Sequence, residues 1–599
     1  MGSCRPRDPA PGWPLGTATA RRCAAIALLT LAAAGAQSDA GKPAKGGASA
    51  AGKLGAAAPK SAGKANAPPP PPLTLPAAEL RDHARFLATS PKLTALGAAP
   101  RAAAARQYMA EQLYETGLLP GGDGQHGIAG FLQAVSMVGA RSVVRGVPQF
   151  RSNATTIPVQ IAVAPREIVL FADDRSDTVE VKDSEIVFAG HCVTAPAQSW
   201  DDYKGSDVRG KVVLCLDGGP KGFAGQAAVT RWPQKVAEAA RRGAAAALLV
   251  HSASDVRLGD PSLPFWRSYY ASEQLLPSAQ GDSATSFQLR GVITDDAARR
   301  LLQAGREDLD TLRRAADERD FEPRALRVRM TARLQNQTRP IESANIVGIL
   351  PGSDETLREE AVLYTAHIDG VNAYAESPPE GSVITPGVRD RIVGAAALLT
   401  MAKATRQTPP PARSQIFALV VGHGEGFVGT ARLLKHLPAP VRKVIAHVSV
   451  DGINIGDEFP EITQSGRGKS SLDAILDAAA TAQGRHVGGE PRLARDLYYR
   501  NESLPLARLG IPSLLLAPLD LDSYLGNDYL QPTDVFRDGW TFAGGAQDSA
   551  LLYACGLAIA GAGPAPTHRD PAPRTWPHFV AGDEFASPAP ASVAPPVRP

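Results

Sequence analysis

Apolar residues at helical spacing open the folded part of the chain. Beyond Pro76 they recur three and four positions apart, as at Ala105, Tyr108 and Met109, and Gly117 stands where such a helix would end. This spacing gathers apolar side chains on one face of a helix, so we expect amphipathic helices here.

Near residue 150 the pattern changes to short β-type runs separated by Gly and Pro. A helical stretch at 236–242 interrupts these runs, and helical segments near 295–312 follow them. Short strands with turn residues between them predict a compact β-rich module. The strands are expected at residues 168–171, 185–189, 210–216, 244–250 and 326–334.

After Ser343 strand and helix patterns alternate regularly. This alternation predicts an α/β fold, a mixed and mostly buried sheet flanked by helices. Strands are expected at 345–350, 362–366, 416–421, 444–450 and 511–517, and helices at 394–403, 429–436, 472–483 and 547–560.

The two ends of the chain lack these patterns. Residues 1–36 predict a secretory signal peptide, because paired arginines precede a short apolar run and a small-residue cleavage pattern. An uncleaved amphipathic tail is the alternative. The run is too short to span a bilayer, so we expect an exported protein, periplasmic or secreted, with no membrane span in the mature chain.

The composition of residues 37–75 predicts a disordered Ala/Gly/Lys/Pro linker. That of residues 566–599 predicts a Pro-rich tail, whose segment 576–585 could pack onto the body.

Composition narrows the class of partner. The chain has 599 residues and a net charge of +3, with no dense basic stripe outside the N-terminal tail. Nucleic acid is therefore not an expected partner. The length exceeds what one typical core accommodates, so about two or three domains are expected.

The mature chain would keep three cysteines, Cys192, Cys215 and Cys555. An odd number cannot be fully paired within one chain. Cys215 and Cys555 both lie in apolar patterns, so we expect them to be buried small hydrophobic residues.

Acidic residues and one histidine follow the predicted strands. An apolar run ends in His367-x-Asp369, Asp390 lies just before a helix, and Asp451 follows the run 444–450. Active sites of open α/β sheets are built at the carboxyl ends of the strands. One imidazole and two carboxylates from three such ends predict a divalent-metal site. Each residue alone could equally be a solvated loop residue or a cap.

In order and spacing, the chain resembles the secreted two-zinc aminopeptidases that carry an inserted protease-associated domain. Their superfamily includes glutamate carboxypeptidase, the transferrin receptor ectodomain and nicastrin. The resemblance implies a zinc-aminopeptidase fold, with a peptidase domain in two parts, 76–149 and 336–565, around an inserted domain at 150–335. It rests on segments 104–119, 366–369, 387–394, 417–430, 450–452, 499–512 and 529–534.

The resemblance also implies roles for single residues. His367, Asp390 and Asp451 match the ligands of one zinc ion, with Asp390 as the bridging carboxylate. Asp369 matches the carboxylate that orients the histidine ligand, which would fix the tautomer of its ring.

The second zinc position departs from the family pattern. His423 replaces the general-base Glu, Gly424 replaces a ligand Glu, and Leu530 replaces a ligand His. The family's Ser-Asp-His before the last strand is here Asn501-Glu502-Ser503. Because glycine and leucine offer no donor atom, the second position should be empty, and at most one zinc ion is expected.

Several interpretations of the remaining site stay open. His423 could act as a base beside one zinc ion, or turn inward as a fourth ligand and close the site. Glu425 could reach in from one position later, or the residues could form a polar cluster without metal.

We therefore predict a zinc metallopeptidase homologue that is impaired or inactive, a pseudoenzyme retained to bind peptides or a protein partner. The alternative is an active mononuclear-zinc exopeptidase that removes N-terminal residues from peptides. The sequence leaves the oligomeric state open.

Overall fold

The computed structural model describes most of the chain beyond residue 72, and all of these residues belong to one compact unit, Pro70–Pro599. The expected signal peptide, most of the linker and the segment 576–585 lie outside the described residues. None of the helices in the described part is both long and apolar enough to cross a membrane. The described ranges are 73–94, 98–153, 161–173, 176–223, 227–251, 266, 273–277, 287–369, 386–424 and 426–569.

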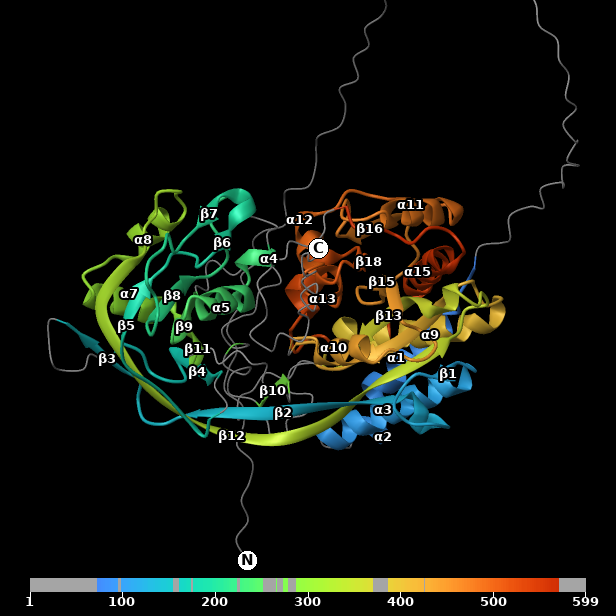
Figure 1. Ribbon diagram of the computed structural model, residues 1–599, viewed down its shortest axis with the longest axis horizontal. Coiled ribbons are helices and arrows are strands. Elements are labelled where there is room, and N and C mark those ends of the chain that lie inside the picture. The colour runs from blue at the N-terminus through green and yellow to red at the C-terminus, as the bar shows by residue number, and fades with distance from the viewer. Residues whose placement is uncertain are drawn as a thin grey trace, which may run out of the picture. The chain divides into compact units, whose positions relative to one another are not determined.

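Helices open the described part, as the apolar spacing predicts (Figure 1, blue). The first helix buries Leu80, Ala84 and Leu87, which share one face because they are three to four positions apart. Gly117 follows the third helix with φ of +81°, a left-handed conformation that glycine adopts without strain. These helices are α1 (Ala77–Thr89), α2 (Pro91–Thr94) and α3 (Ala98–Glu115).

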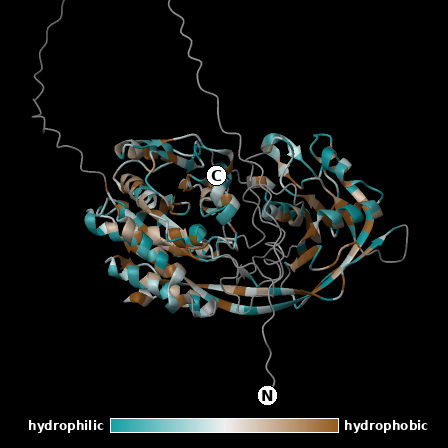
Figure 2. Ribbon diagram, turned by 180° about the vertical axis from the view of Figure 1, so that it is seen from behind, coloured by the Kyte–Doolittle hydropathy of each residue, from teal (hydrophilic) through white to brown (hydrophobic). Residues whose placement is uncertain are grey.

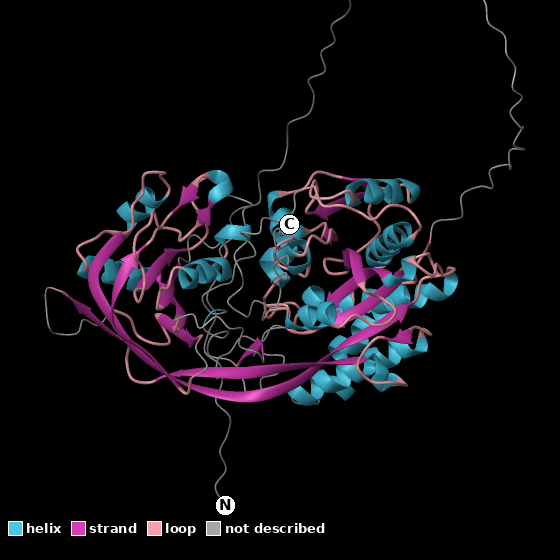
Figure 3. Cartoon of the chain, in the orientation of Figure 1, coloured by secondary structure: helices cyan, strands magenta, loops and turns pink. Residues whose placement is uncertain are grey.

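A mixed sheet forms the centre of the C-terminal half (Figure 3, magenta). β13 pairs in parallel with both β14 and β15, and β15 pairs in parallel with β18. β12 and β16 add antiparallel neighbours at the two sides. Every residue of β14 is buried, which confirms the predicted mixed and mostly buried sheet. The strands are β12 (Arg324–Leu350), β13 (Glu360–His367), β14 (Ser414–Val420), β15 (Lys443–Ser449), β16 (Glu461–Ser465), β17 (His486–Val487) and β18 (Ser513–Ala517).

Helices flank this sheet and complete its core. α9 is buried along almost its whole length, and α1, α9 and α15 share one hydrophobic cluster with the strands. In Figure 2 the helices carry both hydrophobic and hydrophilic positions, as expected of helices that cover a sheet. The helices are α9 (Val393–Ala404), α10 (Val428–Lys435), α11 (Leu472–Ala482), α12 (Arg492–Leu497), α13 (Ser503–Arg508), α14 (Leu521–Ser523) and α15 (Ala543–Ala560). Short helical turns lie at Leu357–Glu359, Val388–Ile392, Thr405–Gln407 and Tyr524–Asp528.

β12 joins this sheet to the rest of the structure. It is a single strand of 27 residues that pairs with β5, then with β2, and finally with β14 (Figure 1). The sequence predicts two separate strands here, at 326–334 and 345–350, and this separation is wrong. Polar residues at 337–339 and Pro340 interrupt the apolar pattern, whereas pairing with β2 continues through them.

Along the chain, the predicted β-rich module lies between the first three helices and the C-terminal half. β5, β8, β9 and β11 pair in parallel, and β4 pairs antiparallel with β11. Strands of this part are β1 (Leu119–Pro120), β2 (Leu132–Val144), β3 (Gln149–Ser152), β4 (Ile168–Ala172), β5 (Thr178–Phe188), β6 (Thr194–Ala195), β7 (Trp200–Asp201), β8 (Val212–Leu216), β9 (Ala246–His251), β10 (Gln274–Pro277) and β11 (Leu289–Thr294). Its helices and helical turns are Ile128–Phe131, Pro196–Gln198, α4 (Ala227–Thr230), α5 (Trp232–Arg241), α7 (Asp295–Ala304) and α8 (Leu309–Ala316).

The cysteines correct one expectation. Cys215 is buried, as the apolar run predicts, but it forms a disulfide with Cys192 and is not a free hydrophobic residue. The pairing joins β8 to the loop that precedes β6, a contact between segments that the sequence pattern does not bring together. Cys555 is buried and free, which confirms the prediction for that residue.

Candidate metal site

The predicted ligands lie at the carboxyl ends of neighbouring strands. His367 is the last residue of β13, and Asp451 follows β15, which is the parallel neighbour of β13. Asp390 lies in the helical turn Val388–Ile392 that leads into α9. Nδ1 of His367 is 3.1 Å from Oδ1 of Asp451, and its Nε2 is 4.0 Å from Oδ2 of Asp390. The structure therefore brings these side chains together.

The charges of this group depend on one another. Burial alone disfavours a charged imidazole, but the carboxylates of Asp451 and Asp390 outweigh it and raise the pKa of His367 well above its usual value. Burial likewise disfavours the charge of Asp390, yet the hydrogen bond and charge of His367 lower the pKa of that carboxyl to about 2. The group is thus a buried cluster of opposite charges, in which a bound cation could take the place of the proton on the imidazole.

Asp369 has different contacts from those that the resemblance implies. Its carboxylate accepts hydrogen bonds from the backbone N–H groups of Gly422 and His423, the latter at 3.4 Å. The ring nitrogens of His367 instead contact Asp451 and Asp390. Asp369 therefore fixes the turn that follows β14, and its role in orienting His367 stays a prediction.

The side chain of His423 lies against that of His367. The two rings stack with their centroids 3.9 Å apart and an interplanar angle of 15°. Nδ1 of His423 is 3.0 Å from Oε1 of Glu502. His423 therefore reaches the predicted site, whereas Glu425, the other candidate from this turn, lies outside the described residues.

Glu502 is the residue that sequence reasoning missed. It is fully buried at the start of α13, and although burial disfavours its charge, the charge and hydrogen bond of His423 lower its pKa. Its Oε2 is buried and has no hydrogen-bond partner among the described residues. The available signal was a carboxylate between Asn501 and Ser503, in the segment where the family carries its own acidic residue.

His367, His423 and Glu502 make a set of possible metal ligands. One ligand atom from each lies within 4.8 Å of those of the other two. Protein zinc sites use imidazole and carboxylate donors, and a two-histidine, one-glutamate set is among those known. Asp390 or Asp451, which face opposite nitrogens of the His367 ring, would add a fourth donor, so the donor chemistry of the cluster fits one zinc ion.

Gly424 and Leu530, the two positions without a donor atom, both lie among the described residues. Around Gly424 the space is open, since an added Cβ would meet no atom within 4 Å. Leu530 has φ of +56° and packs against an apolar cluster of the β-rich module that includes Phe171, Tyr203 and Trp232. Its side chain therefore takes part in apolar packing.

Several contacts hold Asp390 in place. The hydroxyl of Tyr524 donates to Oδ1 of Asp390 at 3.1 Å, and Asp534 accepts from the backbone N–H groups of Arg389 and Asp390. Burial raises the pKa of Asp534 to about 6. The guanidinium of Arg389 is buried against Asp528 at 2.7 Å, so the turn is tied to the C-terminal part of the chain.

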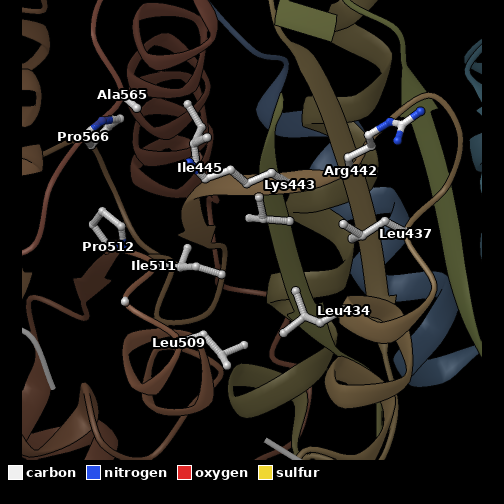
Figure 4. Close-up of a pocket in the computed structure, with 12 residues that line it drawn as sticks. Leu434, Leu437, Arg442, Lys443, Ile445, Leu509, Ile511, Pro512, Ala565 and Pro566 are labelled. Carbon is white, nitrogen blue, oxygen red and sulfur yellow. The ribbon is translucent and has the colours of Figure 1, made fainter. Parts of the chain in front are cut away.

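A separate pocket of about 340 Å³ lies at the other end of β15, and Figure 4 shows the apolar side chains that line it, with Arg442 and Lys443 beside them. It reaches β15 at Lys443–Ile445, which is roughly 20 Å along the strand from Asp451 at 3.3 Å per residue. The pocket is therefore distinct from the candidate metal site. Its apolar lining includes Leu434, Leu437, Leu509 and Ile511.

Comparison with known proteins gives two family matches. Residues 345–553 match Peptidase family M28, and residues 182–285 match the PA domain. No curated protein matches the chain.

Three solved structures are similar at low sequence identity. The aminopeptidase from Aneurinibacillus sp. strain AM-1 is 17% identical with a TM-score of 0.47, over 82% of this chain and 96% of that chain. BSAP, a zinc aminopeptidase from Bacillus subtilis, is 15% identical with a TM-score of 0.40, over 80% of this chain and 95% of that chain. The peptidase M28 precursor from Shewanella amazonensis SB2B is 16% identical with a TM-score of 0.38, over 83% of this chain and 99% of that chain.

Proposed function

Since the chain belongs to Peptidase family M28 and carries an inserted PA domain, we propose that it binds at most one zinc ion and has little or no aminopeptidase activity. The observation that carries this proposal is the pair Gly424 and Leu530, which replace ligands of the second zinc in the family pattern. Of the ligands assigned to that position, only Asp390 remains, and one carboxylate is a weak anchor for zinc.

The ligands proposed for the single ion are His367, Asp390 and Asp451. Two zinc ions supply an acidified bridging water and stabilisation of the oxyanion in hydrolysis of this kind. In this chain the general-base Glu is replaced by His423, and loss of a general base alone slows such reactions by about 100- to 10,000-fold. Loss of the second ion removes further stabilisation of the transition state.

We propose that the fold is retained to bind peptides or a protein partner. The strand ends that carry the site are held by buried contacts, such as the pair Arg389–Asp528 and the hydrogen bonds that Asp369 accepts. These contacts do not depend on turnover, so a binding surface could persist after hydrolysis is lost.

One observation favours a second candidate, an active mononuclear-zinc exopeptidase that removes N-terminal residues from peptides. His423 occupies the general-base position and contacts the buried carboxylate of Glu502 at 3.0 Å. A carboxylate that holds an imidazole in one orientation is a common support for a catalytic base.

The sequence patterns support two further parts of the proposal. We propose that the protein is exported, with a signal peptide at 1–36, and that the peptidase domain comprises 76–149 and 336–565 around the inserted domain. β12 crosses the boundary proposed at residue 335, so the two domains share this strand.

Metal analysis combined with a panel of aminoacyl-amide substrates tests the function. We expect at most one zinc ion per purified chain and no turnover that a chelator abolishes. Metal-dependent turnover at ordinary enzyme rates, lost in His367→Ala and Asp451→Ala, would instead establish the exopeptidase.

A further inference from the structure

We infer that His423 and Glu502 bind the same ion as His367 and close its coordination shell, so that the site is structural and not catalytic. This inference rests on the proposed single zinc ion and specifies its ligands. It explains how a member of a hydrolase family could keep a metal ion without keeping the reaction.

The donor atoms of three side chains lie close together. The ligand atoms of His367, His423 and Glu502 lie within 4.8 Å of one another, although the residues come from three separate segments. The side chains of His367 and Glu502 are 4% and 0% exposed, and that of His423 is 18% exposed. Such convergence of imidazole and carboxylate groups away from water is typical of zinc sites.

One carboxylate oxygen of Glu502 has no hydrogen-bond partner in the described part of the chain. Its Oε1 is 3.0 Å from His423, but its Oε2 is buried without a hydrogen-bond partner among the described residues. Burying a carboxylate is costly unless both oxygens are paired or coordinate a metal. A bound cation would supply the missing partner.

Hydrogen bonds hold the backbone that carries these three side chains. His367 ends a buried strand, and Glu502 directly precedes α13, where the N–H of Leu506 donates to the carbonyl oxygen of Glu502. The turn that carries His423 is fixed by Asp369, which accepts hydrogen bonds from the N–H groups of Gly422 and His423. Ligands held by such contacts lose little freedom on binding an ion.

The number of donors decides between an open and a closed site. Three protein ligands and a water make a catalytic zinc site, whereas four protein ligands make a structural one. Two histidines and Glu502 already supply three donors. The carboxylates of Asp451 and Asp390 face opposite ring nitrogens of His367, at 3.1 Å and 4.0 Å, so one of these two supplies the fourth donor. No position then remains for the water that hydrolysis requires.

Zinc affinity of the full chain, measured by competition with a chelating dye, tests the ligand assignment. We expect Glu502→Gln and His423→Ala each to weaken zinc binding by at least about tenfold, the range reported for loss of groups that support a metal. Glu458→Gln and His486→Ala are matched controls, because both side chains are exposed, and these variants should bind zinc as the wild type does.

Cobalt(II) provides a measurement on the unmodified chain, which keeps the test valid even if a variant fails to fold. A closed shell predicts that azide leaves the visible absorption of the cobalt-loaded protein unchanged. In Glu502→Gln a position opens, so azide should change the spectrum. An azide-dependent change in the wild type would show an open site and overturn the inference.

The outcomes separate this inference from the proposed function. If Asp390→Asn and Asp451→Asn lose zinc while Glu502→Gln and His423→Ala retain it, the inference is wrong and the single-zinc proposal stands. If the wild type binds two zinc ions, or one together with rapid turnover, the proposed function itself is wrong. If it binds none, the closed site is refuted, and the substrate panel still decides the question of activity.

Discussion

Nδ1 of His367 lies 3.1 Å from Oδ1 of Asp451, a contact between the ends of two neighbouring parallel strands. Both side chains are largely buried, and Asp390 lies on the other side of the imidazole at 4.0 Å. The cluster places one buried cation between two buried anions. The cost of burying each charge is therefore offset by the opposite charges beside it.

Removing the imidazole should therefore destabilise the metal-free protein. In His367→Ala, Asp451 and Asp390 would remain buried without their cation, and breaking a buried pair costs about 3–5 kcal/mol. Chemical denaturation in the presence of a chelator measures this loss. His486→Ala, which changes an exposed histidine, should leave the free energy of unfolding almost unchanged. Equal stability of His367→Ala and the wild type would refute a stabilising cluster.

Restoring the family's ligands should restore the second zinc ion. We expect the triple variant with His423→Glu, Gly424→Glu and Leu530→His to bind more zinc than the wild type and to gain chelator-sensitive turnover. The open space around Gly424 admits a larger side chain, and histidine is among the residues that tolerate the positive φ of position 530.

A control for the triple variant carries His423→Gln, Gly424→Gln and Leu530→Met, which adds similar bulk with poor zinc donors. It should gain neither zinc nor activity. If the triple variant likewise gains neither, the alignment of 417–430 and 529–534 with the family pattern is wrong.

The strand-end rule accounts for what the sequence could predict of the site. His367 and Asp451 follow apolar runs, and the carboxyl ends of parallel strands meet at one edge of a sheet, so their proximity follows from local pattern. Glu502 follows no apolar strand. Its place beside His423 depends on how α13 packs, which is a long-range property that spacing does not encode.

Long-range packing also explains the errors in the predicted fold. The polar residues 337–339 and Pro340 divide one strand into two in the sequence pattern. In the structure, β2 pairs with β12 throughout this stretch and holds it extended. Likewise, the partner of Cys215 could not be chosen from the sequence, because the distance between two cysteines is set by the packing of the segments that carry them.

The stability of the protein should depend on pH through His447. Burial, which outweighs the charge of Glu502, lowers the pKa of this histidine to about 4 from an ordinary value of 6.5. The unfolded chain therefore binds the proton first as pH falls. The contribution of His447 to stability is greatest above pH 6.5 and declines by about 3 kcal/mol as pH falls to 4.

His447→Gln removes this titration. Its free energy of unfolding should be lower at pH 7, because the neutral ring contacts Thr365 Oγ1 at 2.7 Å and Ser513 Oγ at 3.0 Å. The difference from the wild type should shrink toward pH 4. Denaturation curves at several pH values measure it, and a difference that stays constant with pH would assign the decline to other groups.

The disulfide between Cys192 and Cys215 should contribute measurably to stability. It closes a loop with a sequence separation of 23, for which the loss of chain entropy in the unfolded state corresponds to about 3 kcal/mol. The double variant Cys192→Ala and Cys215→Ala should therefore unfold at a lower denaturant concentration than the wild type. Reduction of the wild type should have the same effect, and should leave the double variant unchanged.

Cys555→Ala is the matched control, because this buried cysteine is free. It should lower stability by only about 1 kcal/mol, the cost of a small cavity, and should do so equally with and without reductant. Under non-reducing denaturing conditions, a chain that begins at residue 37 should contain one reactive thiol, which Cys555→Ala removes. Three reactive thiols in the non-reduced wild type would mean that Cys192 and Cys215 are not bonded, and the predicted dependence on reductant would then disappear.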